Sequence, residues 1–394
     1  MTFASRMAQI APSPTLKVTA EADRLRRQGI DVVDLGAGEP DFPTPEHVKA
    51  AAHLALDQNF TKYTPSAGIV EVRQAVCQRY ADDYGVTFAP EQVLMTAGGK
   101  QALFNTAFVL LDPGDEVVTH APYWPTIPEQ VKLAGATPVI VQTSPEDGFA
   151  IHAEAMIAAM TPRTKAVIIN SPSNPAGALI SEGDLRAIAE EAARRHIWVV
   201  ADLTYEKLIY DPVPHNLPSV LLHTVPDRFA ICSAASKAYA MTGWRCGWVI
   251  GPKAFIAQCN ALQGHSTSNI NSITQRAAVA ALTGPQDSVT EMLNEYRRRR
   301  DAVTALLTAD PRITVVKPQG AFYLFPYLAD VLEATGLRTT AEFAAALLAE
   351  AHVAVTAGEG FDAPGFVRLS YATSMERLEE GMRRLHAFIA RRSQ

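Results

Sequence analysis

Lys237 and Arg245 lie eight residues apart in the segment SKAYAMTGWRCGW. The amine of a lysine can form an imine with a carbonyl compound, and an arginine can bind a phosphate through its paired N–H groups. A protein that holds a phosphorylated aldehyde in reactive form needs both groups. Because such pairs are also common on solvated surfaces, the meaning of this one depends on the rest of the chain.

The elements that must position these residues form a repeating pattern between residues 69 and 283. Apolar β-rich runs alternate there with helical patterns, which is typical of a largely parallel sheet built from βαβ units. Ligands gather beyond the carboxyl ends of such strands. Gly98, Gly99 and Lys100 follow the first expected strand, Asp202 ends the fifth, and Lys237 follows the sixth. The seven expected strands are Gln92–Thr96, Glu116–His120, Thr137–Val141, Lys165–Asn170, Ile197–Asp202, Phe229–Ser233 and Cys246–Gly251.

The segment around Lys237 resembles the active-site lysine motif of class I/II aminotransferases, the fold type I enzymes that depend on pyridoxal 5′-phosphate (PLP). Further matches follow in order along the chain: Asn174 in NSPSNPAG, Asp202 and Tyr205 in ADLTYEK, and Arg368 in FVRLSYATS. The resemblance is strongest to the Thermus-like subgroup of bacterial aspartate aminotransferases. It implies an α/β fold with a mostly parallel seven-stranded sheet and a smaller α+β domain.

The resemblance assigns roles around the cofactor ring. Lys237 would form the imine with PLP and carry the proton from the substrate Cα, and Asp202 would pair with the protonated pyridine nitrogen. Tyr205 and Asn174 would donate to the phenol oxygen, and Trp124 in APYWP would stack on the ring. Trp124 and Asn174 would also border the substrate. The family often reads D-E-x-Y, whereas this chain has Leu203 after the aspartate.

The phosphate needs backbone N–H donors and positive charge. Gly99 and Lys100 open the helical run that continues from Gln101 to Leu110, and Arg245 supplies the guanidinium. Ser236 is the expected hydroxyl ligand, because Ala234 stands at the third position before the lysine, where the family has a serine.

Tyr63 in TKYTPSAG resembles the tyrosine that reaches the phosphate from the neighbouring subunit. The resemblance therefore implies a homodimer with shared active sites.

The substrate must present its carboxylates in a fixed orientation, and arginine pairs with carboxylates through two parallel bonds. By resemblance, Arg368 and the amide of Gly38 in GAGEPDF meet the α-carboxylate, and Lys100 meets the distal one, with Thr15 nearby. These matches favour aspartate, glutamate and their oxo acids in a ping-pong reaction. Ala11 replaces the basic residue of prephenate-using members and weakens that alternative.

Other activities stay open at this point. An aminotransferase for aromatic amino acids or alanine, and a PLP lyase or decarboxylase, would use the same lysine. A regulatory domain that binds PLP without turnover is a further alternative, and the lack of an appended DNA-binding segment argues against it.

The length of 394 residues favours two domains. We expect residues 46–285 to form the large PLP-binding domain, and 1–45 with 286–394 to form the small one. The net charge of -6 gives no electrostatic reason to bind nucleic acid. The basic run Arg297–Arg300 is expected on a solvated face of a helix from 286 to 307.

No apolar stretch approaches the roughly 20 residues of a membrane span, and the first residues lack the apolar core of a signal peptide. We therefore expect a cytoplasmic enzyme without membrane partners. The four cysteines lack metal-ligand spacing and are expected to be reduced and mostly buried.

Overall fold

The central sheet has seven strands, each within one residue of its expected limits. The structure is a computed structural model that describes residues 4–11 and 14–394. The strand order is β2-β8-β7-β6-β5-β3-β4; β8 runs antiparallel to both of its neighbours, and the pairs from β7 to β4 are parallel. The strands are β2 (Val93–Thr96), β3 (Glu116–Ala121), β4 (Thr137–Gln142), β5 (Thr164–Asn170), β6 (Trp198–Asp202), β7 (Phe229–Ala234) and β8 (Gly247–Ile250).

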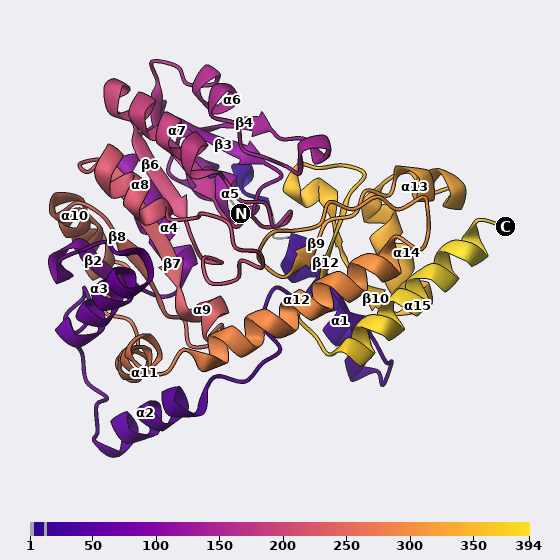
Figure 1. Cartoon of the computed structure of the whole chain (residues 1–394), viewed down its shortest axis with the longest axis horizontal. Helices are drawn as coiled ribbons and strands as arrows, with labels where there is room; N and C mark the ends of the chain where they lie inside the picture. Colours follow the sequence, from indigo (N-terminus) through magenta and orange to yellow (C-terminus); the bar gives the residue numbers. More distant parts are fainter. Residues whose placement is uncertain (1–3, 12–13) are drawn as a thin grey trace.

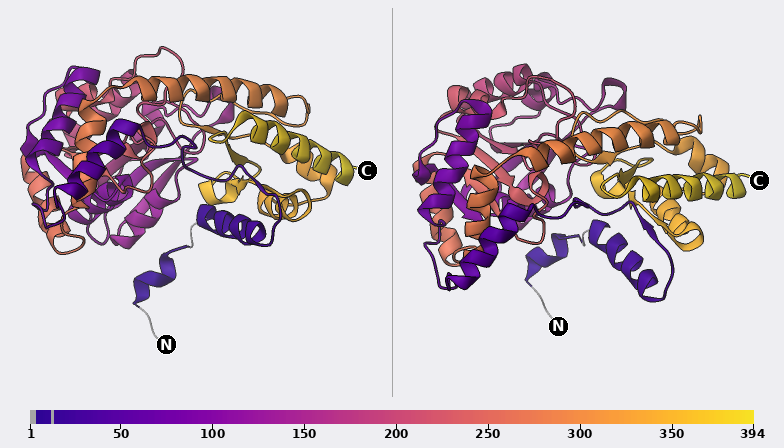
Figure 2. Two further views of the ribbon diagram at one scale, coloured as in Figure 1. Left: turned by 90° about the horizontal axis from the view of Figure 1, so that it is seen from below. Right: turned by 60° about the horizontal axis from the view of Figure 1, so that its bottom comes forward.

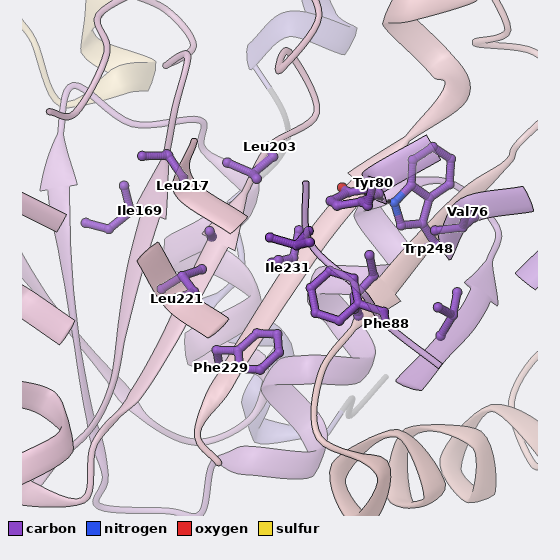
Figure 3. Packing of buried hydrophobic residues seen from close by; sticks show 14 of the residues in the cluster. Val76, Tyr80, Phe88, Ile169, Leu203, Leu217, Leu221, Phe229, Ile231 and Trp248 are labelled. Atoms are coloured by element: carbon purple, nitrogen blue, oxygen red, sulfur yellow. Dashed lines mark hydrogen bonds between the residues drawn. The ribbon is translucent and has the colours of Figure 1, made fainter. Parts of the chain in front are cut away.

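Helices cover both faces of this sheet (Figure 1). Successive strand residues point to opposite faces, so Val117 belongs to one hydrophobic cluster and Val118 to another. The cluster around Val118 is the larger one and includes Leu203, Phe229 and Ile231, which Figure 3 shows packed together. The helices of this part are α2 (Glu46–Asp57), α3 (Val70–Tyr84), α4 (Gly99–Leu110), α5 (Thr126–Leu133), α6 (Ala153–Ala158), α7 (Glu182–Arg195), α8 (Leu217–Thr224), α9 (Ala235–Ala238), α10 (Lys253–Gly264) and α11 (Ser272–Thr283).

The C-terminal part has its own core beside the sheet (Figure 1). Its antiparallel strands are β9 (Tyr323–Leu324), β11 (Thr356–Ala357) and β12 (Val367–Ser370), in the order β11-β12-β9. Its helices are α12 (Asp287–Leu307), α13 (Ala329–Thr335), α14 (Thr340–Ala351) and α15 (Met375–Arg392). Residues 313–316 contribute an isolated bridge between Thr314 and Tyr327.

The N-terminal segment packs on this C-terminal part, as Figure 2 shows. Strand β1 (Val33–Asp34) pairs in parallel with β10 (Val353–Ala354), and α1 (Pro14–Arg27) places Ala22 and Leu25 in a cluster with Leu348. The domain limits at about residues 45 and 285 stay a prediction.

The expected solvated face for Arg297–Arg300 is wrong for two of the four arginines. Arg299 and Arg300 are buried, at 6% and 1% exposure. Arg299 forms an ion pair with Asp41 at 2.8 Å, and Arg300 donates to the carbonyl of Pro318 at 3.0 Å. Because four consecutive residues of a helix point all around its axis, such a run cannot stay on one solvated face.

Two other expectations concern the cysteines and the membrane. All four cysteines are free; Cys232, Cys246 and Cys259 are buried and Cys77 is half-buried, as expected. Among the residues described, no helix combines the length and the apolar character that crossing a bilayer requires.

Candidate active site

A cavity of about 430 Å³ opens at the carboxyl ends of β5, β6 and β7 and brings together most of the predicted site residues. Eleven of them line it: Gly38, Gly99, Lys100, Trp124, Asn174, Asp202, Tyr205, Ser236, Lys237, Arg245 and Arg368. Tyr63 does not line it and is 93% exposed. Thr15 lies in α1, and its side chain is outside the part of the chain that the structure describes.

Lys237 lies in the short helix α9, directly after β7. Its Nζ donates to the carbonyl oxygen of Gly38 at 2.5 Å and lies 5.9 Å from the centre of the Tyr205 ring. Burial lowers the pKa of Lys237 to about 8, because the charged form loses hydration, and Glu39 opposes this shift. The amine of Lys237 therefore becomes neutral and nucleophilic at a lower pH than the amine of an ordinary lysine does.

Asp202 ends β6 and is 2% exposed. Its Oδ1 accepts hydrogen bonds from the backbone N–H of Thr204 at 3.1 Å and from the Thr204 hydroxyl at 2.7 Å. Burial raises the pKa of Asp202, whereas both bonds from Thr204 and the charge of Lys237 lower it. The loop thus fixes one oxygen of the carboxylate while Asp202 lines the cavity.

Leu203, which departs from the family pattern, points into the hydrophobic core and is 1% exposed. Figure 3 shows it beside Leu217 and Ile231. The nearby carboxylate is Glu206, whose Oε1 accepts from Ser233 at 2.6 Å and whose Oε2 accepts from Tyr84 at 2.8 Å. The loop after β6 is therefore anchored by apolar packing at Leu203 and by hydroxyl donors at Glu206.

Arg368 comes from β12 in the C-terminal part and is 2% exposed. Its guanidinium donates to Asn174 Oδ1 at 3.1 Å and to the carbonyl of Gly36 at 2.8 Å, and it lies 4.3 Å from the centre of the Tyr323 ring. Its Nε is buried without a hydrogen-bond partner among the described residues. A planar cation that lines the cavity and is held in place by two acceptors is suited to bind a carboxylate.

A second part of the cavity lining, formed by Gly99 and Arg245, is suited to a phosphate. Helix α4 begins at Gly99, so its first N–H groups have no partner within the helix. The guanidinium of Arg245 donates to the carbonyls of Ala97 at 3.2 Å and Thr242 at 2.9 Å. Gly98 has a φ of +83°, a conformation that favours glycine, and a Cβ there would lie 2.5 Å from the guanidinium and push it aside.

Lys100 follows this helix start and lies over Trp124, with its Nζ 5.1 Å from the ring centre. Burial lowers the pKa of Lys100, and the charge of Arg245 adds to the shift. The cavity thus has one cation at Arg368 and another at Lys100, which come from different parts of the chain.

Several lining residues escaped the sequence reasoning, among them Asn170, Thr204 and Tyr323. Asn170 accepts a hydrogen bond from the backbone N–H of Asn174 at 2.9 Å. It ends β5 as Asp202 ends β6, so its position at a strand end was a usable signal. Tyr323 carried no local signal, because it reaches the cavity from β9 in the C-terminal part.

Comparison with known proteins gives a consistent result. The model of the family "Aminotransferase class I and II" matches residues 30–385. The chain is 45% identical to the aspartate aminotransferase of Geobacillus stearothermophilus, with 100% of both chains covered. It is 43% identical to the aspartate/prephenate aminotransferase of Thermus thermophilus, with 98% of each covered.

Solved structures agree with these sequence comparisons. The aspartate aminotransferase of Thermus thermophilus with maleate superimposes with a TM-score of 0.93 at 42% identity, covering 98% of this chain and 100% of that one. The match extends through both parts of the chain, including the elements that carry Lys237, Asp202 and Arg368. The chain belongs to the class I and II aminotransferases and has their fold type I architecture.

Proposed function

We propose that the protein is a PLP-dependent aspartate aminotransferase that works as a cytoplasmic homodimer. The observation that carries the proposal is the cavity, which is lined by a lysine of lowered pKa and by two further cations, Arg368 and Lys100, suited to the two carboxylates of a dicarboxylic amino acid. Relatives named aspartate aminotransferase over the full length of the chain support the choice of substrate.

The residues present fit PLP. The cavity volume falls within the roughly 300–1,000 Å³ of small-molecule sites. The amine of Lys237, the start of α4 with Arg245, and the carboxylate of Asp202 offer partners for an aldehyde, a phosphate and a protonated ring nitrogen. Asn174 and Tyr205 would donate to the phenol oxygen, Trp124 would pack on the ring, and Ser236 would add a hydroxyl at the phosphate.

When bound, PLP supplies an aldehyde that accepts the amino group and a ring that takes up negative charge. Arg368 and the Gly38 amide would orient the α-carboxylate, and Lys100 would bind the distal one. Lys237, as a neutral amine, would take the proton from the substrate Cα and deliver it to C4′ of the cofactor. Asp202 would keep the ring nitrogen protonated through direct charge pairing. Amino donor and oxo acid would occupy the same cavity in turn, which is a ping-pong scheme.

The homodimer is proposed from Tyr63. Its side chain is 93% exposed and outside the cavity, which suits a residue that reaches the phosphate of a neighbouring subunit.

Prephenate is a second candidate substrate, because relatives in Thermus thermophilus and Cereibacter sphaeroides are named aspartate/prephenate aminotransferases. Ala11 stands in place of the basic residue of prephenate-using members, which argues against prephenate as a substrate.

Lys100→Ala tests the substrate assignment. Removing a buried partner of the distal carboxylate should lower kcat/KM for aspartate and glutamate by roughly two orders of magnitude. Alanine and phenylalanine lack that carboxylate and should be largely unaffected. The measurement is a screen of the half-reaction with single amino acids. The reaction is monitored through the loss of the absorbance of the PLP-loaded enzyme.

Two variants complete this screen. Lys100→Arg keeps the positive charge and should retain much of the preference for dicarboxylates, whereas Arg368→Ala should impair all amino acids alike. An equal loss for every substrate in Lys100→Ala would mean that Lys100 acts on the phosphate or the fold, and the aspartate assignment would fail.

The lowered pKa of Lys237 predicts a pH dependence for cofactor capture. Only the neutral amine attacks an aldehyde, and burial favours that form from about pH 8 upward. When PLP is added to the cofactor-free protein, the rate of covalent attachment should rise with pH, with a midpoint near pH 8, and level off roughly one unit above it. Stopped-flow absorbance checks this. A midpoint near the roughly 10.4 of an ordinary lysine would contradict it.

A further inference from the structure

Tyr323 connects two functional side chains that come from different parts of the chain. It lies in β9, is 1% exposed, and lines the cavity. Its hydroxyl lies 2.8 Å from the hydroxyl of Tyr205, and the Arg368 guanidinium lies 4.3 Å from the centre of its ring. One side chain thus contacts both the proposed cofactor-facing tyrosine and the proposed binder of the α-carboxylate.

The direction of the bond between the two hydroxyls follows from the single proton that each phenol carries. Within the described residues, the hydroxyl of Tyr205 is the hydrogen-bond partner of the Tyr323 hydroxyl. Either hydroxyl can donate this bond, but a tyrosine has a single proton, and the proposed function requires Tyr205 to donate that proton to the phenol oxygen of the cofactor. Tyr323 therefore donates, and the proton of Tyr205 is left free to point into the cavity.

Burial raises the pKa of both tyrosines, and it raises that of Tyr205 well above the ordinary value. At Tyr323 the neighbouring Arg368 cation is the second cause and opposes burial, because it stabilises the ionised phenol. Arg368 also lowers the pKa of Tyr205, so this cation acts on both hydroxyls of the pair.

The phenol also has a fixed place against the backbone. A Cβ at Gly38 would lie 3.1 Å from the Tyr323 hydroxyl and 4.0 Å from the Arg368 guanidinium. The glycine therefore lets the hydroxyl end of Tyr323 approach the segment whose amide is proposed to meet the α-carboxylate.

We propose that Tyr323 is a positioning residue with two separable parts. Its hydroxyl aims the proton of Tyr205 at the cofactor, and its ring fixes the plane of the Arg368 guanidinium for the substrate α-carboxylate. This inference rests on the proposed function, because it needs PLP and a carboxylate in the cavity.

The two parts predict different effects. Chained hydrogen bonds polarise one another, so Tyr205 is a stronger donor while Tyr323 donates to it. A donor at the phenol oxygen of PLP favours the ionised oxygen, so losing Tyr323's hydroxyl should raise the apparent pKa of the bound cofactor by roughly a few tenths of a unit. Losing the ring should weaken carboxylate binding by about 3- to 30-fold, the range of a cation over an aromatic face.

The experiment compares Tyr323→Phe, which keeps the ring, with Tyr323→Leu, which removes both parts. Tyr327→Phe is the matched control, because Tyr327 is 41% exposed and does not line the cavity. Two quantities are measured on the PLP-loaded proteins without turnover. One is the absorbance as a function of pH, and the other is the dissociation constant for maleate, a dicarboxylate without an amino group.

We expect Tyr323→Phe to shift the titration upward while its maleate affinity stays within about twofold of the wild type. Tyr323→Leu should show the same titration shift and weaker maleate binding, and Tyr327→Phe should match the wild type in both. An unshifted titration in Tyr323→Phe would overturn the role of the hydroxyl, and Tyr323→Phe remains decisive if Tyr323→Leu fails to fold. Weakened maleate binding in Tyr323→Phe would overturn the separation of the two parts. A wild type without any PLP absorbance would instead overturn the proposed function itself.

Discussion

Lys237→Ala is expected to abolish turnover, with kcat lowered by about 10⁴-fold, the upper end of what a positioned general base contributes. PLP should still bind, because the start of α4, Arg245 and Asp202 are unchanged. The bound cofactor should lose the absorbance of a covalent attachment. The measurements are steady-state rates with aspartate and an absorbance spectrum of the loaded variant.

The attachment point can be mapped directly. Two lysines, Lys237 and Lys100, line the cavity in the part of the chain that the structure describes. Borohydride treatment of the PLP-loaded wild type and peptide mapping should place the reduced pyridoxyl group on Lys237. Lys100→Ala is the control and should be labelled at the same position. A pyridoxyl group on Lys100 would overturn the central assignment.

The sheet was predictable because its residues carry a local signal. Val117 and Val118, or Ile168 and Ile169, are apolar in succession because both faces of the sheet are covered by helices. The strand ends then located Asp202 and Lys237, because ligands of such sheets gather at one edge. Neither position depends on contacts between residues distant in the sequence.

The other half of the site depends on contacts that sequence spacing does not encode. Tyr205 and Tyr323 are 118 residues apart and meet through their hydroxyls. The burial of Arg300 is another such case, since its partner Pro318 lies in a loop of the C-terminal part. Resemblance to a family supplied Arg368, but the stacking of its guanidinium on Tyr323 became visible only in three dimensions.

Asp202→Ala is expected to lower kcat by roughly 10³-fold while PLP affinity falls much less. The carboxylate pairs with a ring nitrogen whose positive charge matters most when negative charge develops at the substrate Cα. Losing the carboxylate therefore mainly raises the free energy of the transition state. Steady-state rates and a PLP titration followed by fluorescence measure the two effects separately.

Asp202→Asn is the matched variant that separates charge from shape. The amide oxygen can still accept both bonds from Thr204, so the loop after β6 should keep its conformation. The charge is gone, however, and an uncharged partner no longer favours the protonated ring nitrogen. Asparagine should therefore be nearly as slow as alanine. If Asp202→Asn instead kept a near-wild-type kcat, the contribution of Asp202 would be geometric, and the charge that stabilises the ring nitrogen would have to come from another group in the cavity.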